Sequence, residues 1–219
     1  MRKIGHRGAC GYAPENSIAS FQKALDLGVD ALELDVHCSA DGTVMVIHDA
    51  TVDRTTNSSG LVQTKTSNEL VGLGVPTLLE VIDLVQRRVI INIEFKSKEA
   101  MLPTLSLLNQ RISEGKNSSS DFLLSSFDWD ILAEIAAMNL GFPLGVLYED
   151  LQKDPIAFAQ NIRAYSLHPD YKLLTFETVK SIQQKGFKIY PWTVNALDDI
   201  ERLKSWQVDG IISDFPDRL

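Results

Sequence analysis

Short runs of β-branched and apolar residues alternate along the chain with segments in which apolar residues recur every three or four positions. The first pattern is typical of buried strands and the second of amphipathic helices. We expect eight strands, at 3–5, 31–36, 89–95, 122–126, 143–148, 164–167, 188–194 and 210–213. Three of the predicted helices have clear boundaries: Asn16 (N-cap) to Gly28, Thr175 to Gly186, and a third that opens at Asn195.

Strict alternation of strands and helices predicts parallel strands joined by helical crossovers. Eight strand–helix units in 219 residues leave about 27 residues for each unit, which is near the lower size limit of a (β/α)8 barrel. We therefore predict an α/β fold, a TIM barrel, as a single domain over 1–219. The alternative is an open doubly wound sheet, but the chain has no G-x-G-x-x-G or Walker motif.

The segment from Thr43 to about Gly74 interrupts the alternation. It begins with a short strand, TVMVIH, and continues as a polar stretch rich in Thr, Ser, Asn and Gly that has no helical period. We interpret it as a loop excursion after the second strand, a small insertion at about 50–75. Long loops in compact domains are commonly functional, and this one opens on His48 and Asp49, so we expect a functional role.

Composition narrows the classes of protein that the chain can represent. With 21 basic and 29 acidic residues the net charge is −8, and no basic stripe is present to bind nucleic acid. No run approaches the ~20 apolar residues of a membrane-spanning helix, and the first residues, MRKIGHRGACG, do not resemble a signal peptide. We expect a cytoplasmic protein without stable membrane insertion, with Cys10 and Cys38 as free thiols. No sequence feature indicates an oligomeric state.

Carboxylates gather on two predicted strands. Glu33 and Asp35 are two positions apart and share a face, and Glu94 shares one with Asn92 and Lys96. The intervening aliphatic residues would face the helices, which places the acids inside the barrel. In such barrels the catalytic groups lie at the carboxyl ends of the strands.

Three carboxylates that meet in a barrel interior would repel one another unless a cation neutralised them. A hard divalent ion with oxygen ligands, Mg²⁺ or Ca²⁺, suits Glu33, Asp35 and Glu94. Zinc suits them poorly, because no His/Cys cluster has the usual ligand spacing. The alternative is a structural ion-pair network in which these acids pair with Lys96 and Arg7.

Two histidines lie near the same end of the barrel. His6 ends the first strand, and His48 follows the short strand of the insertion. Their proximity to the acids and to Arg7 favours acid–base chemistry, while Arg7 and Lys96 would attract an anionic substrate. His37 is ambiguous, since it shares the parity of Glu33 and Asp35, and we expect His168, which precedes a proline, to shape a loop.

Several motifs in order along the chain resemble the glycerophosphodiester phosphodiesterase family. They are HRG at 6–8, PEN at 14–16, ELDVH at 33–37, HD at 48–49, DRTTNSSG at 53–60, PTLLE at 76–80, IEFK at 93–96, SF at 126–127, WTVN at 192–195 and GIISDFP at 210–216. The resemblance extends over essentially the whole chain. It implies a (β/α)8 barrel with a small insertion after the second strand. One departure is the short LVGLGV between Glu69 and Pro76, where many members have a longer segment.

The resemblance implies a role for each matching residue. His6 and His48 would be the general acid–base pair, Glu33, Asp35 and Glu94 the ligands of one divalent metal ion, and Arg7 and Lys96 the phosphate-contacting cations. Phe127 and Trp192 would line the substrate pocket. Asn16 would hold loop geometry in the PEN motif.

The expected reaction is hydrolysis of a glycerophosphodiester to sn-glycerol 3-phosphate and an alcohol. Either water or the 2-hydroxyl of the glycerol would be the nucleophile, and either histidine could be the acid. Two alternatives are a related barrel phosphodiesterase acting on lysophospholipid head groups, and a non-catalytic phosphate-binding barrel.

Overall fold

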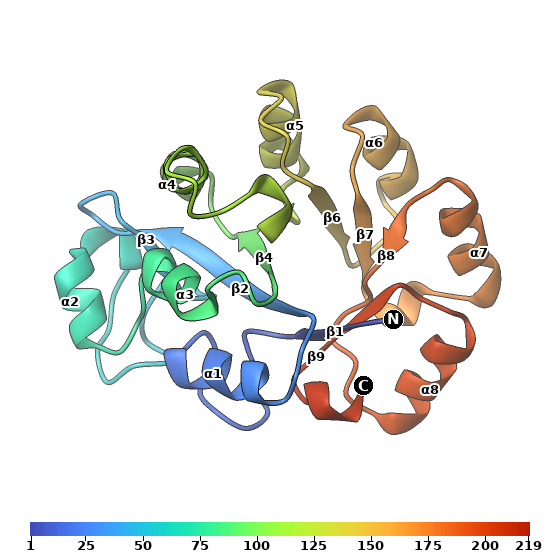
Figure 1. The fold of residues 1–219 in the computed structure, drawn as a ribbon, viewed down its shortest axis with the longest axis horizontal. Coiled ribbons are helices and arrows are strands. Elements are labelled where there is room, and N and C mark those ends of the chain that lie inside the picture. Colours follow the sequence, from blue (N-terminus) through green and yellow to red (C-terminus); the bar gives the residue numbers. More distant parts are fainter.

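The computed structural model describes residues 1–219 as a ring of strands surrounded by helices (Figure 1). The strands are β1 (Arg2–Gly5), β2 (Ala31–Cys38), β3 (Val44–Val46), β4 (Ile90–Phe95), β5 (Phe122–Ser126), β6 (Leu144–Tyr148), β7 (Ser166–Pro169), β8 (Lys188–Ile189) and β9 (Gly210–Ser213). The helices are α1 (Ile18–Asp26), α2 (Ser67–Gly72), α3 (Leu78–Val85), α4 (Met101–Ser113), α5 (Trp129–Ala137), α6 (Pro155–Asn161), α7 (Phe176–Gln184) and α8 (Leu197–Ser205).

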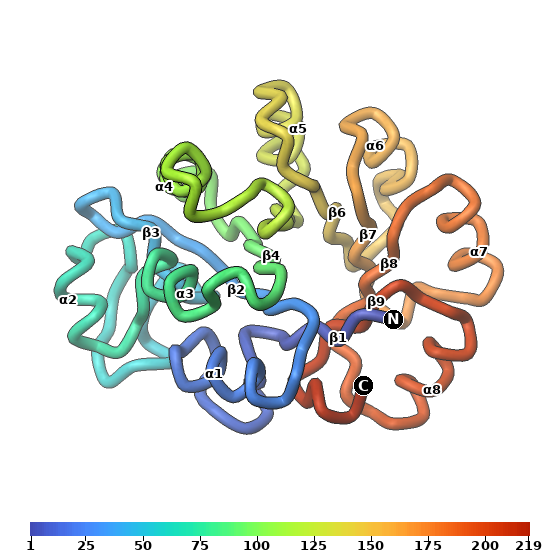
Figure 2. The backbone as a smooth tube through the Cα atoms, viewed as in Figure 1, coloured from blue at the N-terminus to red at the C-terminus, as the bar shows by residue number.

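Eight of the strands are parallel and follow the order β8-β7-β6-β5-β4-β2-β1-β9, while β3 pairs antiparallel with β2. The segment after β8 closes the ring, because Val194 N donates to Ile212 O and Ile212 N donates to Pro191 O, both at 3.0 Å. The predicted TIM barrel is confirmed, and the open-sheet alternative is wrong. The tube drawing in Figure 2 traces the same circular path, and none of the helices has the length and apolar character needed to span a bilayer.

Side chains point alternately outward and inward along each strand. The outward ones form an apolar layer beneath the helices, and the inward ones form an inner column that fills the barrel. Outward residues such as Leu32, Leu34 and Ile93 belong to the large core cluster beneath the helices. The inner column is apolar at one end, with a cluster made up of Ile4, Ala31, Leu123, Tyr190 and Ile212. Its other end holds the buried polar residues of β2 and β4. The fold therefore concentrates charge at one mouth of the barrel.

The insertion lies between β2 and α3 and has a small core of its own, formed by Met45, Ile47, Val52, Val62, Leu70 and Val75. The short strand predicted there corresponds to β3. The expectation of an irregular stretch is wrong at α2, which Thr66 and Glu69 hold with a reciprocal capping box. A six-residue helix with one buried residue is too short to show a hydrophobic period.

Several predicted boundaries are wrong by a few residues. Helix α1 is capped by Ser17 and not by Asn16, whose side chain instead contacts Asp35. Helix α8 starts after Ala196, because Asn195 hydrogen-bonds Asp214. The strand expected at 164–167 is β7 at Ser166–Pro169, and the strand expected at 188–194 is only β8 at Lys188–Ile189. The cap predicted at Thr175 is confirmed.

His168 does not shape a loop, contrary to our expectation. It lies in β7, fully buried inside the barrel, where its Nε2 and the hydroxyl of Ser166 are 2.8 Å apart. Burial lowers the pKa of His168 to about 3, so the ring is neutral at physiological pH. The ring lies over Gly145 of the neighbouring strand β6, where a Cβ would be 2.6 Å from His168 Nε2.

Gly145→Ala is therefore expected to lower the free energy of unfolding by about 1–3 kcal/mol, because the added methyl group overpacks a rigid barrel interior. Gly72→Ala is the matched control, since a Cβ at Gly72 meets nothing within 4 Å. Urea unfolding of both variants measures the effect. Equal midpoints for Gly145→Ala and the wild type would show that the ring has room to move.

Candidate active site

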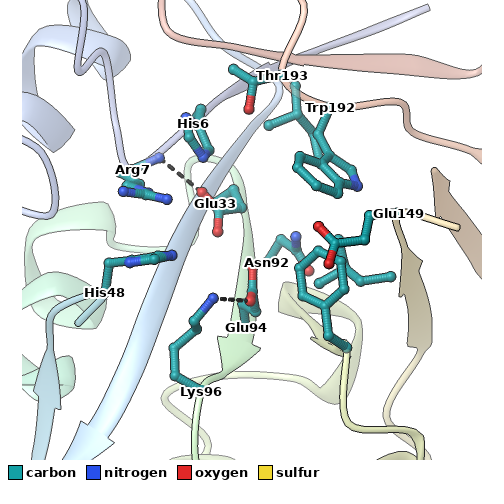
Figure 3. A pocket seen from close by; sticks show the side chains of 13 residues that line it. His6, Arg7, Glu33, His48, Asn92, Glu94, Lys96, Glu149, Trp192 and Thr193 are labelled. Carbon is teal, nitrogen blue, oxygen red and sulfur yellow. Dashed lines mark hydrogen bonds and ion pairs between the residues drawn. The ribbon is translucent and has the colours of Figure 1, made fainter. Parts of the chain in front are cut away.

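A cavity of about 350 Å³ opens at the carboxyl ends of the barrel strands (Figure 3). Its lining includes the loops or strand ends that follow β1, β4, β5 and β6. The lining residues are His6, Arg7, Glu33, His48, Asn92, Glu94, Lys96, Phe127, Leu147, Glu149, Trp192, Thr193 and Ile212. The volume suits a small ligand, and the ionisable residues indicate a charged one.

The acidic cluster forms the floor of this cavity. Parallel register sets Glu33 opposite Asn92 and Asp35 opposite Glu94, so both β2 carboxylates face the β4 carboxylate. Carboxylate oxygens of Glu33, Asp35 and Glu94 lie within 4.8 Å of one another, and all three side chains are buried. The predicted convergence of the three acids is therefore present.

Both predicted cations also pair with these acids. Lys96 Nζ lies 2.7 Å from Glu94 Oε1 and 3.9 Å from Asp35 Oδ1. Arg7 Nε lies 3.2 Å from Asp35 Oδ2, and the backbone N–H of Arg7 donates to Glu33 Oε2 at 2.8 Å. Two positive side chains thus face three acids, which leaves one negative charge uncompensated when all are ionised.

Two observations support binding of a divalent cation by the acidic cluster. Asp35 Oδ1 is buried and accepts no hydrogen bond, so a strong acceptor points at the cluster without a donor. Burial, together with the charges of Asp35 and Glu94, raises the pKa of Glu33 well above its ordinary value. Burial and Asp35 likewise raise the pKa of Glu94 to about 7. A hard divalent cation would give Asp35 Oδ1 a partner and would lower the raised pKa values of Glu33 and Glu94.

Two residues in left-handed backbone conformations hold this floor together. Arg7 has φ 48° and Asn16 has φ 53°, values that are costly for residues with a side chain. Asn16 is buried, and its amide donates to Asp35 Oδ2 at 2.8 Å while its backbone N–H donates to the carbonyl of Arg7 at 3.1 Å. The strain is compensated by these contacts, which orient Asp35. The expectation that Asn16 holds loop geometry agrees with its position.

His6 is oriented by a carboxylate. Its Nδ1 lies 2.6 Å from Asp214 Oδ1, and Asn195 Nδ2 donates to Asp214 Oδ2 at 2.7 Å. Burial opposes ionisation of Asp214, but the hydrogen bonds from His6 and Cys10 lower its pKa to about 2, so it is an anion at neutral pH. With Nδ1 bound to Asp214, Nε2 is left to exchange a proton in the cavity.

His48, which lies below Arg7 in Figure 3, has a similar arrangement. Its Nδ1 lies 2.6 Å from Asp49 Oδ1, and Arg54 Nε donates to Asp49 Oδ2 at 2.7 Å. Arg54 also binds both oxygens of Glu15, which in turn accepts from Arg7. This chain of ion pairs connects the insertion to the floor of the cavity. His48 is therefore oriented by a carboxylate at Nδ1, as His6 is.

The aromatic side of the cavity is formed by Phe127 and Trp192, whose rings meet edge to face with centroids 5.2 Å apart. Trp192 Nε1 donates to the carbonyl of His168 at 2.9 Å, which fixes its ring. Lys96 Nζ lies 5.6 Å from the centre of the Phe127 ring. Glu149 lies beside Trp192 in Figure 3 and lines the same cavity.

All nine predicted site residues meet here: eight line the cavity, and Asp35 adjoins Glu33 and Glu94 beneath it. Sequence reasoning did not assign Asp214, Asn195, Glu15, Arg54 or Glu149. Strand parity could have indicated two of them, because Glu149 is two positions after the inward-facing Leu147 and Asp214 is two after Ile212. His37 lies outside the acidic cluster, and its Nε2 donates to the backbone carbonyl of His48 at 3.1 Å.

The fold and this site place the chain among the barrel hydrolases that act on anionic esters. Residues 6–218 match the model of the glycerophosphoryl diester phosphodiesterase family, and the chain belongs to that family. The match agrees with the resemblance noted in the sequence. Relatives from Caldanaerobacter subterraneus and Bacillus subtilis are glycerophosphodiester phosphodiesterases, and this chain is an enzyme of the same kind.

The similarity extends over full lengths. A glycerophosphodiester phosphodiesterase of Caldanaerobacter subterraneus subsp. tengcongensis is 37% identical over 230 residues, covering 99% of this chain and 95% of the relative. The solved enzyme of Thermotoga maritima superposes with a TM-score of 0.83 at 30% identity, covering 99% and 96% of the two chains. A phosphodiesterase of Oleispira antarctica, solved with the product sn-glycerol-3-phosphate, gives 0.89 at 25% identity and covers 100% and 94%.

Proposed function

We propose that this protein hydrolyses glycerophosphodiesters to sn-glycerol 3-phosphate and an alcohol, using one divalent cation, Mg²⁺ or Ca²⁺, and two histidines. The observation that carries the proposal is the pair of imidazoles, each with a carboxylate at Nδ1, in one cavity with a cluster of three acids. The Oleispira antarctica relative, bound to sn-glycerol-3-phosphate, supports the product.

The cationic residues account for binding of the phosphodiester. Glu33, Asp35 and Glu94 would hold the cation, which when bound supplies Lewis-acid polarisation of a phosphoryl oxygen. Arg7 and Lys96 border the same cavity and would bind the phosphate oxygens. Their charges are fixed in advance by the carboxylates around them, so little reorganisation is needed as negative charge develops in the transition state.

The histidines account for the proton transfers. Each Nδ1 is bound to an anionic aspartate, which fixes the ring and stabilises the imidazolium that forms when Nε2 takes a proton. One of the two, His6 or His48, removes the proton of the nucleophile, and the other protonates the departing alkoxide. The aspartates Asp49 and Asp214 act on the reaction through the rings and are positioning residues.

Phe127 and Trp192 would bind the carbon skeleton of the substrate. Their edge-to-face pair forms an apolar wall opposite the charged side of the cavity, where glycerol carbons can pack. Glu149 adds a carboxylate next to this wall, outside the acidic cluster.

Release of sn-glycerol 3-phosphate from glycerophosphocholine tests the proposal directly. We expect turnover with added Mg²⁺ or Ca²⁺, loss of turnover with EDTA, and recovery when the cation is restored. Faster turnover of lysophosphatidylcholine than of glycerophosphocholine would favour the lysophospholipid alternative. Tight binding without turnover across a panel of diesters would favour the non-catalytic barrel, and turnover that resists EDTA would contradict the metal site.

The melting temperature should reveal binding of the cation independently of enzymatic activity. The pKa of Glu94 is raised from 4.5 to about 7, so between these values the folded protein holds a proton that the unfolded chain has lost. The metal-free protein should therefore lose stability as pH rises through this window. Because the cation needs ionised carboxylates, the rise in melting temperature caused by Mg²⁺ or Ca²⁺ should be larger at about pH 8 than at about pH 5.5.

Melting curves with and without the cation at the two pH values measure this difference. Nonspecific binding of the cation does not depend on the buried carboxylates, so it would give equal shifts at the two pH values. A shift that is equal at both values, or larger at the acidic one, would contradict cation binding by the cluster.

A further inference from the structure

A second group of metal-ligating atoms, separate from the acidic cluster, is formed by His6, Cys10 and Asp214. Asp214 Oδ1 lies 2.6 Å from His6 Nδ1 and 2.8 Å from Cys10 Sγ, and the sulfur is 3.8 Å from the same ring nitrogen. The proposed reaction uses His6 and Asp214, but it gives no role to the thiol. An imidazole nitrogen, a thiol sulfur and a carboxylate oxygen thus meet at one point.

Backbone hydrogen bonds fix the loops that carry these three side chains. The N–H of His6 donates to Ser213 O at 2.9 Å, and the N–H of Gly11 donates to Asp214 O at 3.0 Å. The loop after β1 also packs tightly on the loop after β9, since a Cβ at Gly11 would lie 2.3 Å from the ring of Phe215. The three ligands are therefore held together by the fold and not only by their mutual hydrogen bonds.

Donor chemistry identifies the ion that this group would take. Nitrogen and sulfur donors are poor ligands for Mg²⁺ and Ca²⁺, whereas the combination of His, Cys and Asp is one that Zn²⁺ accepts. We propose that Zn²⁺ binds here through His6 Nδ1, Cys10 Sγ and an oxygen of Asp214, with water at a fourth, open position. The site is separate from the three-carboxylate cluster and differs from it in donor type.

The three groups can reach zinc geometry with small movements. Zn–N and Zn–O bonds of about 2.0–2.1 Å and a Zn–S bond of about 2.3 Å place tetrahedral ligand atoms roughly 3.3–3.7 Å apart. The sulfur and nitrogen are already 3.8 Å apart, so the carboxylate must open from its two shorter contacts by about an ångström or less. His6 and Asp214 are each partly exposed, at 18% and 25%, so an ion can enter from solvent.

Zinc must displace the thiol proton to bind. Burial, and then the hydrogen bond to Asp214, raises the pKa of the Cys10 thiol well above its ordinary value, so the free enzyme carries a thiol and not a thiolate. Zinc binding should therefore release a proton and become tighter as pH rises.

A zinc ion at this position would stop the proposed reaction by capturing His6. With Nδ1 bound to zinc, the neutral ring carries its proton on Nε2 and cannot accept another one in the cavity. Asp214 would be drawn from the ring to the metal at the same time. The inhibitory half of this inference rests on the proposed function, whereas zinc binding itself does not.

The test compares wild-type protein with Cys10→Ser and with Cys38→Ser, the matched control for the other free thiol. Binding is followed with Co²⁺ as a spectroscopic substitute for Zn²⁺, in excess Mg²⁺ to occupy the acidic cluster. We expect a near-ultraviolet thiolate-to-Co²⁺ absorption in the wild type and in Cys38→Ser, removed by Zn²⁺ and absent from Cys10→Ser. Zinc inhibition of diester hydrolysis should weaken at least about tenfold in Cys10→Ser, since even outer-shell changes at metal sites cost that much.

Absence of the absorption from the wild type, or its persistence in Cys10→Ser, would overturn the site. Equal zinc inhibition of wild type and Cys10→Ser would overturn the inhibitory role, because zinc would then act at the acidic cluster or elsewhere. If Cys10→Ser fails to fold, Cys10→Ala makes the same comparison. Failure of hydrolysis in every sample would instead contradict the proposed function and leave the Co²⁺ result to decide the site.

Discussion

His6→Ala and His48→Ala should each lower kcat for release of sn-glycerol 3-phosphate by about 10²–10⁴-fold, the usual contribution of a positioned acid or base. Both rings border the cavity, and each is held by an aspartate at 2.6 Å. Because neither histidine belongs to the acidic cluster, KM and the cation-dependent rise in melting temperature should change little. Steady-state kinetics and melting curves on the same samples separate chemistry from binding.

The double variant gives a sharper test of the pairing. If one histidine is the acid and the other the base of the same reaction, removing both should cost less than the product of the single losses, because residues that act as a unit are not additive. Wild-type turnover in either single variant would remove that residue from the mechanism. A loss of the cation-induced stabilisation in either variant would instead place the histidine among the metal ligands.

The barrel itself could be predicted because its determinants are local. Strands such as β2 and β4 are buried almost throughout and alternate polar with aliphatic residues, and the outward set Leu32, Leu34 and Ile93 packs beneath the helices as expected. The failures occur where tertiary contacts override a local preference. Asn16 is a good N-cap residue, yet it is used to hold Asp35, so the cap moves to Ser17.

β8 is another case of this kind. The apolar run at 188–194 predicts a full strand, but the regular strand ends at Ile189. The backbone beyond it still donates to β7, from Tyr190 N to Leu167 O at 3.0 Å and from Trp192 N to Pro169 O at 3.1 Å, and on its other side it closes the ring against Ile212. A closing segment of a barrel is defined by its partner at the other end of the chain, which no local pattern contains.

The inward-facing carboxylates and the histidines of the site could be predicted from the sequence, because strand parity and the ends of the strands determine where they lie. Its supporting residues were not, because they come from remote segments. Asp214 reaches His6 across 208 positions of sequence, and Arg54 reaches Glu15 across 39. Such partners become visible only when the loops at the mouth of the barrel are assembled.

Asp35→Asn should lower turnover at least about 10³-fold, because a cation that polarises the phosphoryl group is worth several kcal/mol. Asp35 is 1% exposed and lies between the other two acids and both cations, so its charge is central to the cluster. The Mg²⁺- or Ca²⁺-dependent rise in melting temperature should also disappear. Asp198→Asn, on the exposed face of α8, is the matched control and should retain both activity and the shift.

The same substitution decides between the cation site and the structural ion-pair network. In a structural network, Asp35→Asn would break the ion pairs that Asp35 forms with Arg7 and Lys96, and the metal-free protein should lose about 3–5 kcal/mol of stability. In a cation site the three acids already outnumber Arg7 and Lys96, and burial, together with the repulsion between the acids, raises the pKa values of Glu33 and Glu94. Removing one charge then relieves repulsion, so the metal-free variant should be about as stable as the wild type while activity is lost.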